Sequence, residues 1–78
     1  MKIVRVEWLD AFGDTGRHWQ DVESVEAEPM VMVTVGFEIP DAMEGYLVIA
    51  QTYCDLTKSV DHLIYIPDGM VLGRRLMK

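Results

Sequence analysis

The chain lacks most of the features that stabilise very small proteins. It contains one cysteine, Cys54, in 78 residues, so no disulfide can form within it. The two histidines and the cysteine lie far apart in the sequence, which argues against a structural zinc site. A domain of this size buries only about 60% of the surface that its unfolded chain exposes. We therefore expect no metal and no cofactor, and we expect assembly into a homo-oligomer to supply stability.

Positive charge is scarce. Seven Lys and Arg residues stand against thirteen Asp and Glu residues, which gives a formal net charge of −6. An acidic surface repels nucleic-acid phosphates, so general DNA or RNA binding is disfavoured. A small anionic ligand held in a local basic pocket is still compatible with this charge.

Long apolar runs are also missing. No segment approaches the roughly 20 apolar residues of a transmembrane helix, and charged residues interrupt the N-terminal segment too often for a signal peptide. We therefore expect a cytoplasmic protein without membrane contact, and free Cys54 fits a reducing compartment. Half of the residues are apolar, which excludes a disordered chain.

The common enzyme motifs do not occur. The sequence has no phosphate-binding glycine loop before a lysine, no C-x-x-C and no G-x-S-x-G. Cys54 with His18 or His62 would be the one nucleophile and base pair. The alternative is an inert thiol beside Asp55, whose negative charge is expected to raise the pKa of Cys54. We favour the alternative and predict that the protein is not an enzyme.

What the sequence does contain is strand periodicity. Apolar residues alternate with polar ones or fill short runs, as is typical of β-strands. We expect strands over residues 2–9, 30–39, 46–53, 62–66 and 70–77. Between the first two, Trp19, Val22 and Val25 recur every three residues, which predicts a short helical turn. The chain is thus expected to form one all-β domain over residues 1–78.

The second expected strand has two different faces. Val31, Val33 and Val35 point one way, whereas Met30 and Met32 lie on the opposite face. Methionine side chains adapt to many partners. If they are exposed, this face is an apolar patch suited to a second subunit or another partner.

Gly36 interrupts the second strand and indicates a bulge or a sharp bend. A bent long strand and a Pro-turn before a short last strand predict a five-stranded antiparallel barrel, in which the first and last strands are neighbours. The order of features resembles the Sm-like and SH3-like small barrels, through Thr34-Val35-Gly36-Phe37 and the Ile66-Pro67 turn. This resemblance implies a fold and little about function.

The whole chain is similar to short proteins of tailed phages and their prophages. The similarity is carried by Val6-Glu7-Trp8-Leu9-Asp10, Thr34-Val35-Gly36-Phe37, Ala50-Gln51-Thr52 and Ile66-Pro67. Small phage proteins of this size commonly counter host defence, some by binding host proteins and others by sequestering nucleotide signals. The resemblance therefore implies a binding protein that acts in the cytoplasm of the host cell.

One candidate ligand site is the run Gly16-Arg17-His18-Trp19. The indole of Trp19 can stack on a base, and Arg17 can pair with a phosphate through two hydrogen bonds, beside the imidazole of His18. The alternative is that Trp19 plugs the end of the barrel while Arg17 is solvated.

A second candidate follows from the expected architecture. If the first and last strands are neighbours, Arg5 lies near Arg74 and Arg75, and the three cations can form a phosphate site. The alternative is that these arginines form ion pairs with Glu7 and neighbouring acids. Tyr53 and Tyr65 are either stacking platforms for a base or parts of the barrel wall.

These observations leave three functions open. The preferred one is sequestration of a small nucleotide-derived immune signal at subunit interfaces, by Arg17, His18, Trp19, Tyr53, Tyr65, Arg74 and Arg75. The second is inhibition of a host protein through an acidic face, for which residues 21–28 carry four carboxylates. The third is a structural role in the virion.

Overall fold

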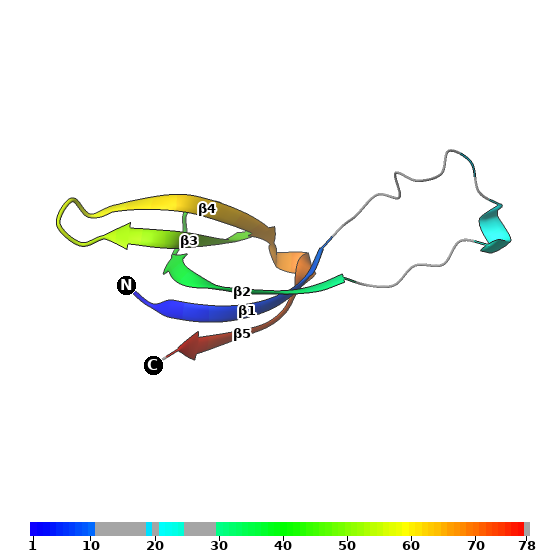
Figure 1. The fold of residues 1–78 in the computed structure, drawn as a ribbon, viewed down its shortest axis with the longest axis horizontal. Coiled ribbons are helices and arrows are strands. Elements are labelled where there is room, and N and C mark those ends of the chain that lie inside the picture. The colour runs from blue at the N-terminus through cyan, green and yellow to red at the C-terminus, as the bar shows by residue number, and fades with distance from the viewer. Residues whose placement is uncertain (11–18, 20, 25–29, 78) are drawn as a thin grey trace.

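The computed structural model describes residues 1–10, 19, 21–24 and 30–77. These residues form one antiparallel sheet with the strand order β4-β3-β2-β1-β5, and two short 3-10 helices (Figure 1). The elements are β1 (Ile3–Asp10), η1 (Val22–Ser24), β2 (Met30–Ile39), β3 (Tyr46–Cys54), β4 (Ser59–Pro67), η2 (Asp68–Met70) and β5 (Val71–Met77). The all-β class, the five antiparallel strands and the helical turn in the first loop are therefore confirmed.

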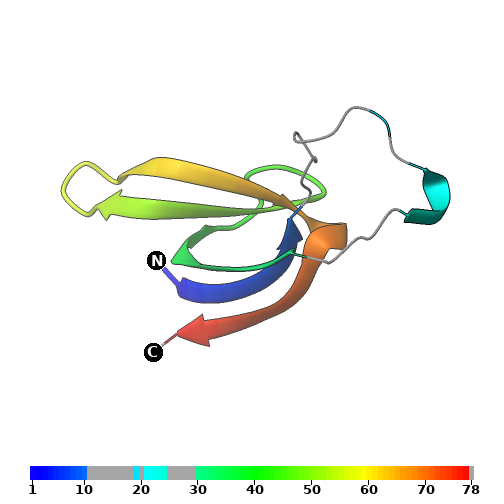
Figure 2. The same ribbon diagram turned by 45° about the vertical axis from the view of Figure 1, so that its right-hand side comes forward.

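The sheet is strongly curved but open (Figure 2). β4 and β5 form its two edges, and the described residues show no pairing between them. Only the three residues of η2 separate the end of β4 from the start of β5, so the two edges approach each other at that end alone. The first and last strands are neighbours as expected, whereas the closed barrel is not confirmed.

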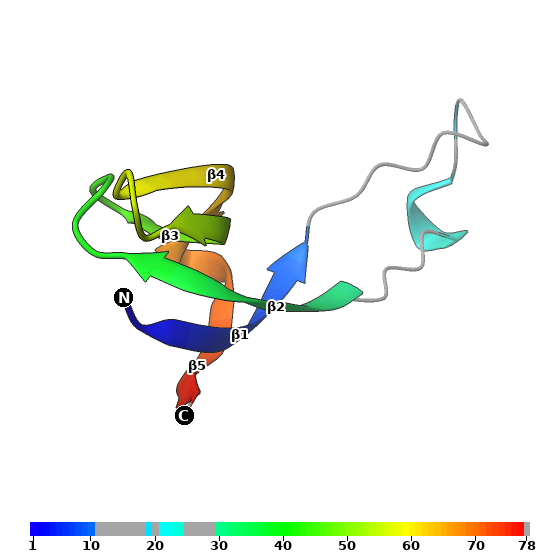
Figure 3. The same cartoon turned by 60° about the vertical axis from the view of Figure 1, so that its left-hand side comes forward.

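β2 belongs to both halves of the sheet. It pairs with β1 from Met30 to Phe37, but with β3 only over its last three residues, 37–39. Figure 3 shows β2 passing from the side of β1 to the side of β3. At the crossing, a Cβ atom on Gly36 would lie 2.5 Å from the carbonyl oxygen of Ala50 and 2.6 Å from Cγ2 of Ile49. Glycine is required there because no side chain fits. The β1–β2 register continues unbroken through Gly36, so the strand has no bulge at this position.

The core lies between the two halves of the sheet. Its centre is Val4 and Val6 of β1, Ile49 of β3 and Ile66 of β4, all fully or almost fully buried. Trp8 packs against this cluster. Its indole Nε1 donates a hydrogen bond of 2.9 Å to Oγ1 of Thr34, which ties β1 to β2.

The two faces of β2 are the reverse of what the sequence suggested. In the β1–β2 register, Met32 pairs with Trp8 and Thr34 with Val6, and paired residues share a face of the sheet. The even-numbered residues of β2 therefore face the core, and Met32 is half-buried. The valines Val31, Val33 and Val35 are instead 53%, 51% and 52% exposed. The expectation that Met32 belongs to an exposed methionine patch is wrong, although Met30 at the strand end is exposed.

Candidate functional site

The structure does not bring all of the predicted ligand residues together. Arg17 and His18 lie outside the described residues. Trp19 is described, and its side chain is 96% exposed. An indole that open to solvent does not plug the end of a barrel, so that alternative is wrong.

The two tyrosines lie far apart on the β3–β4 hairpin. Tyr53 pairs with Val60 near the hairpin loop, whereas Tyr65 pairs with Val48. Val48 and Tyr53 are five positions apart, which is roughly 17 Å at about 3.3 Å per residue. The ring of Tyr53 contacts that of Phe37, with centroids 5.8 Å apart, so Tyr53 is a wall residue. Tyr65 is half-exposed on the opposite edge strand from β5.

The arginines, in contrast, meet as predicted. In the β1–β5 ladder Arg5 is the direct partner of Arg75. Arg5, Arg74 and Arg75 line one shallow cavity of about 240 Å³ together with Glu7 and Gly73. We call these three arginines the arginine cluster. Like charges directly opposite each other on neighbouring strands destabilise a sheet, so this placement needs compensation.

Two carboxylates provide part of that compensation. Nη1 of Arg5 donates a hydrogen bond of 2.7 Å to Oε1 of Glu7. On the other face, Nε and Nη2 of Arg74 donate to the two carboxylate oxygens of Glu38, at 2.6 and 2.5 Å. In the described part of the chain Arg75 has no acidic partner. The cluster therefore has one uncompensated cation, and it lies directly opposite a second cation.

The Arg74–Glu38 pair also sets the protonation of both groups. The hydrogen bond from Arg74 holds the pKa of Glu38 below its usual value of 4.5, although partial burial of the carboxylate acts in the opposite direction. The same bond raises the pKa of Arg74. Arg74 is thus engaged with Glu38, and the groups left to meet an anion are Arg75 and Arg5.

The local backbone keeps this surface open. Gly73 lies opposite Glu7, and the β1–β5 register shifts just beyond this pair, between Glu7 and Trp8. A Cβ atom on Gly73 would meet nothing within 4 Å. The absence of a side chain at this position leaves room for a ligand atom beside the guanidinium groups.

The structure does not assemble a cysteine–histidine pair within the described residues. Nδ1 of His62 lies 3.3 Å from Oδ2 of Asp61, and the exposed thiol of Cys54 interacts with Thr57. Hydrogen bonds from the hydroxyl and the backbone of Thr57 lower the pKa of Cys54. The expectation that Asp55 raises the pKa of this thiol is therefore wrong, because Asp55 instead binds Nζ of Lys58 at 2.9 Å.

Two features are absent from the part of the chain that the structure describes. No group of three or more His, Cys, Asp or Glu side chains is arranged to hold a metal ion. None of the helices has the length and apolar character needed to cross a membrane.

The ion pair of Arg5 with Glu7 was the alternative predicted from the sequence, and it is confirmed. Two other residues around the arginine cluster were not predicted: Glu38 and Gly73. Glu38 could not be identified from the sequence, because its partner Arg74 is 36 positions away and the contact depends on sheet curvature. Gly73 carried no signal beyond being a glycine within a strand.

Comparison with known proteins gave no relative. No protein-family profile matches the chain, and neither the curated proteins nor the solved structures contain a similar one.

Proposed function

We propose that the protein is a non-catalytic binding protein that takes up a small phosphate-bearing ligand of the nucleotide class at the arginine cluster. The observation that carries this proposal is the direct pairing of Arg5 with Arg75 in a chain of net charge −6. Two cations held opposite each other, one without an acidic partner among the described residues, repel until an anion lies between them. The surroundings of Gly73 leave space for that anion.

The geometry suits one compact oxyanion, such as a phosphate group, better than a polyanion. A guanidinium group presents paired donors that match two oxygens of one phosphate, and a cavity of about 240 Å³ admits one such group. A long nucleic acid would meet the acidic remainder of the surface. The exposed indole of Trp19 is available to stack on the base of a nucleotide.

In this proposal the protein sequesters a nucleotide-derived signal rather than converting it. The phage resemblance of the sequence supports a role against host defence in the host cytoplasm. Copies of the chain assemble in this proposal.

The test is calorimetry against cyclic dinucleotides, cyclic oligonucleotides, cyclic ADP-ribose derivatives and inorganic phosphate. Hydrogen bonds to a charged group contribute about 1.5–3 kcal/mol, and about 1.4 kcal/mol corresponds to tenfold in affinity. We expect Arg75→Ala to weaken binding at least tenfold and to flatten its salt dependence. Lys58→Ala is the matched control, because this cation lies in the β3–β4 loop, paired with Asp55.

Two results would overturn the proposal. One is that no compound binds more tightly than about 10 µM, for which the binding free energy is only about −7 kcal/mol. The other is that a compound binds equally well to the Arg75→Ala protein, which would place the site elsewhere. In the first case, capture of a host protein through the acidic residues, including exposed Glu23, becomes the better account.

A further inference from the structure

The first part of β2 is paired on one side only. From Met30 to Val35 its partner is β1, and pairing with β3 begins at Phe37. No other strand of the described chain lies against this stretch. We call the unpaired side of residues 30–35 the open edge.

The direction of the backbone groups along the open edge follows from one hydrogen bond. The amide of Glu38 donates to the carbonyl oxygen of Lys2 at 2.9 Å, which makes these two residues a hydrogen-bonded pair. In an antiparallel ladder such pairs alternate with pairs that do not exchange hydrogen bonds. The even-numbered residues of β2 therefore bond to β1. Val31, Val33 and Val35 point their N–H and C=O groups towards the open edge.

This edge also lacks the usual protection against pairing. Exposed edge strands normally carry charges, prolines or bulges that discourage a further strand. Residues 30–35 contain no charged residue and no proline. The other two free edges are protected: β4 carries Asp61 and ends at Pro67, and β5 carries Arg74 and Arg75.

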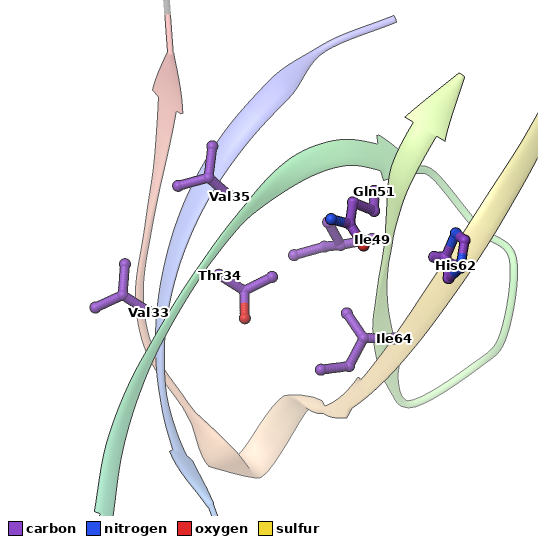
Figure 4. A pocket seen from close by; sticks show the side chains of 7 residues that line it. All are labelled: Val33, Thr34, Val35, Ile49, Gln51, His62 and Ile64. Atoms are coloured by element: carbon purple, nitrogen blue, oxygen red, sulfur yellow. The ribbon is translucent and has the colours of Figure 1, made fainter. Parts of the chain in front are cut away.

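The space beside the open edge is not fully occupied by the described chain itself. A cavity of about 330 Å³ borders it, lined by Val33, Thr34, Val35, Ile49, Gln51, His62 and Ile64. Figure 4 shows Ile49 and Ile64 projecting from β3 and β4 towards β2. The lining combines four aliphatic side chains with Thr34, Gln51 and His62 and contains no lysine or arginine, so it suits an uncharged extended segment better than an anion.

We propose that the occupant of the open edge is β2 of a second copy, paired antiparallel about a two-fold axis at Val33. Two copies with a charge of −6 each repel, and the neutral stretch 30–35 is where they can approach with least repulsion. In this register Val33 exchanges both backbone hydrogen bonds with Val33 of the second copy. Val31 then faces Val35 of the second copy, and the half-exposed valines of both chains form one continuous apolar strip. Such a two-fold contact is self-complementary and needs no other protein.

Val33→Pro tests this pairing directly. Proline at position 33 removes the central one of the three N–H groups that point to the open edge and leaves the bonds between β1 and β2 intact. Proline is tolerated on edge strands where the replaced N–H faces away from the sheet. We expect a dimer for the wild type by sedimentation equilibrium and at least a tenfold larger dissociation constant for Val33→Pro. Val33→Thr is the matched control, because it keeps the N–H and the β-branched shape.

Two further measurements keep the outcome clear. If Val33→Pro fails to fold by circular dichroism, Val33→Lys replaces it, because a lysine at the strip places like charges opposite each other across the two-fold axis. Raising the salt concentration should strengthen the dimer, since it screens the repulsion between two acidic chains. Phosphate binding at the arginine cluster should weaken with salt, so the two proposals fail independently.

Three results would overturn the inference. A wild type that stays monomeric at all concentrations would leave the open edge to an extended segment of another protein. A dimer that is unaffected by both Val33→Pro and Val33→Lys would form through a different surface. A dimer that weakens with added salt would be held by charges that residues 30–35 do not have.

Discussion

Arg74 and Glu38 are joined across the strand between them. Arg74 lies on β5 and Glu38 near the end of β2, with β1 in the middle of the three strands. Both guanidinium donors reach the same carboxylate. The side chain of Glu38 is only 14% exposed and that of Arg74 40%. The pair therefore links three strands on one face of the sheet, at positions 36 residues apart in the chain.

The first prediction concerns how the contribution of this ion pair to stability changes at low pH. The folded-state pKa of Glu38 is lowered from the usual 4.5, so its contribution to stability is complete above that value and is lost as the pH falls through the lowered pKa. Glu38→Gln should cost about 1 kcal/mol at neutral pH, given that the pair is partly exposed. Urea unfolding should show this difference shrinking well below pH 4.5.

Glu44→Gln is the control for that experiment, because Glu44 lies in the exposed turn between β2 and β3. The free energy of unfolding of Glu44→Gln should equal that of the wild type at every pH. A Glu38→Gln protein with the same pH profile as the wild type would show that the pair contributes nothing in solution.

The second prediction concerns Gly36. Gly36→Ala should destabilise the fold by roughly 2–4 kcal/mol, because the new Cβ would overlap the backbone of Ala50. Gly73→Ala is the matched glycine-to-alanine change in a strand with open space around it, and it should change stability by less than about 1 kcal/mol. Equal urea midpoints for the two variants would mean that β2 does not cross β3 as closely as described.

The third prediction concerns the hydrogen bond between Trp8 and Thr34. Thr34→Val keeps the shape of the side chain and removes the acceptor of the indole N–H. The free energy of unfolding should fall by about 1 kcal/mol. The loss should be larger if no water molecule accepts the hydrogen bond of the half-buried indole N–H in place of Thr34. Thr52→Val, at an exposed position on β3, should be close to neutral in the same urea titration.

The fourth prediction concerns the reactivity of Cys54. Because Thr57 lowers the pKa of the thiol from 9.0, a larger fraction is thiolate at a given pH below that value. Thr57→Val should raise the pKa and slow alkylation by iodoacetamide at neutral pH. A pH–rate profile that is identical for the two proteins would show that Thr57 does not bind the thiolate.

The sequence was sufficient to locate the strands but not to show which face of β2 points to the core. Period-two patterns located the five strands within a few residues, with the largest error at the start of β4, which begins at Ser59 rather than at residue 62. The pattern of β2 could not reveal its inner face, because valines and methionines alternate and both are apolar. The deciding factor is Gly36, which must face the neighbouring backbone of Ala50 and so brings Thr34 and Met32 to the core side.

The candidate site was predictable to a similar degree. The neighbour relation of the first and last strands was enough to place Arg5 beside Arg75. The engagement of Arg74 by Glu38 was not predictable, because a one-dimensional pattern does not give the curvature that lets a side chain reach over β1. Trp19 was expected either in the core or on a ligand. Its exposure excludes a place in the core, which the sequence alone could not do.

The short β2–β3 pairing has a mechanical consequence. Three residue pairs join β2 to β3, whereas β1–β2 and β3–β4 are each held by eight. The molecule is therefore two long ribbons connected by a narrow junction next to a glycine. Local opening costs less where fewer backbone hydrogen bonds hold a segment, so the backbone pairing at this junction should open more readily than the pairing in the middle of either ribbon. Amides of residues 37–39 that bond to β3 should then exchange with solvent sooner than those in the middle of β1.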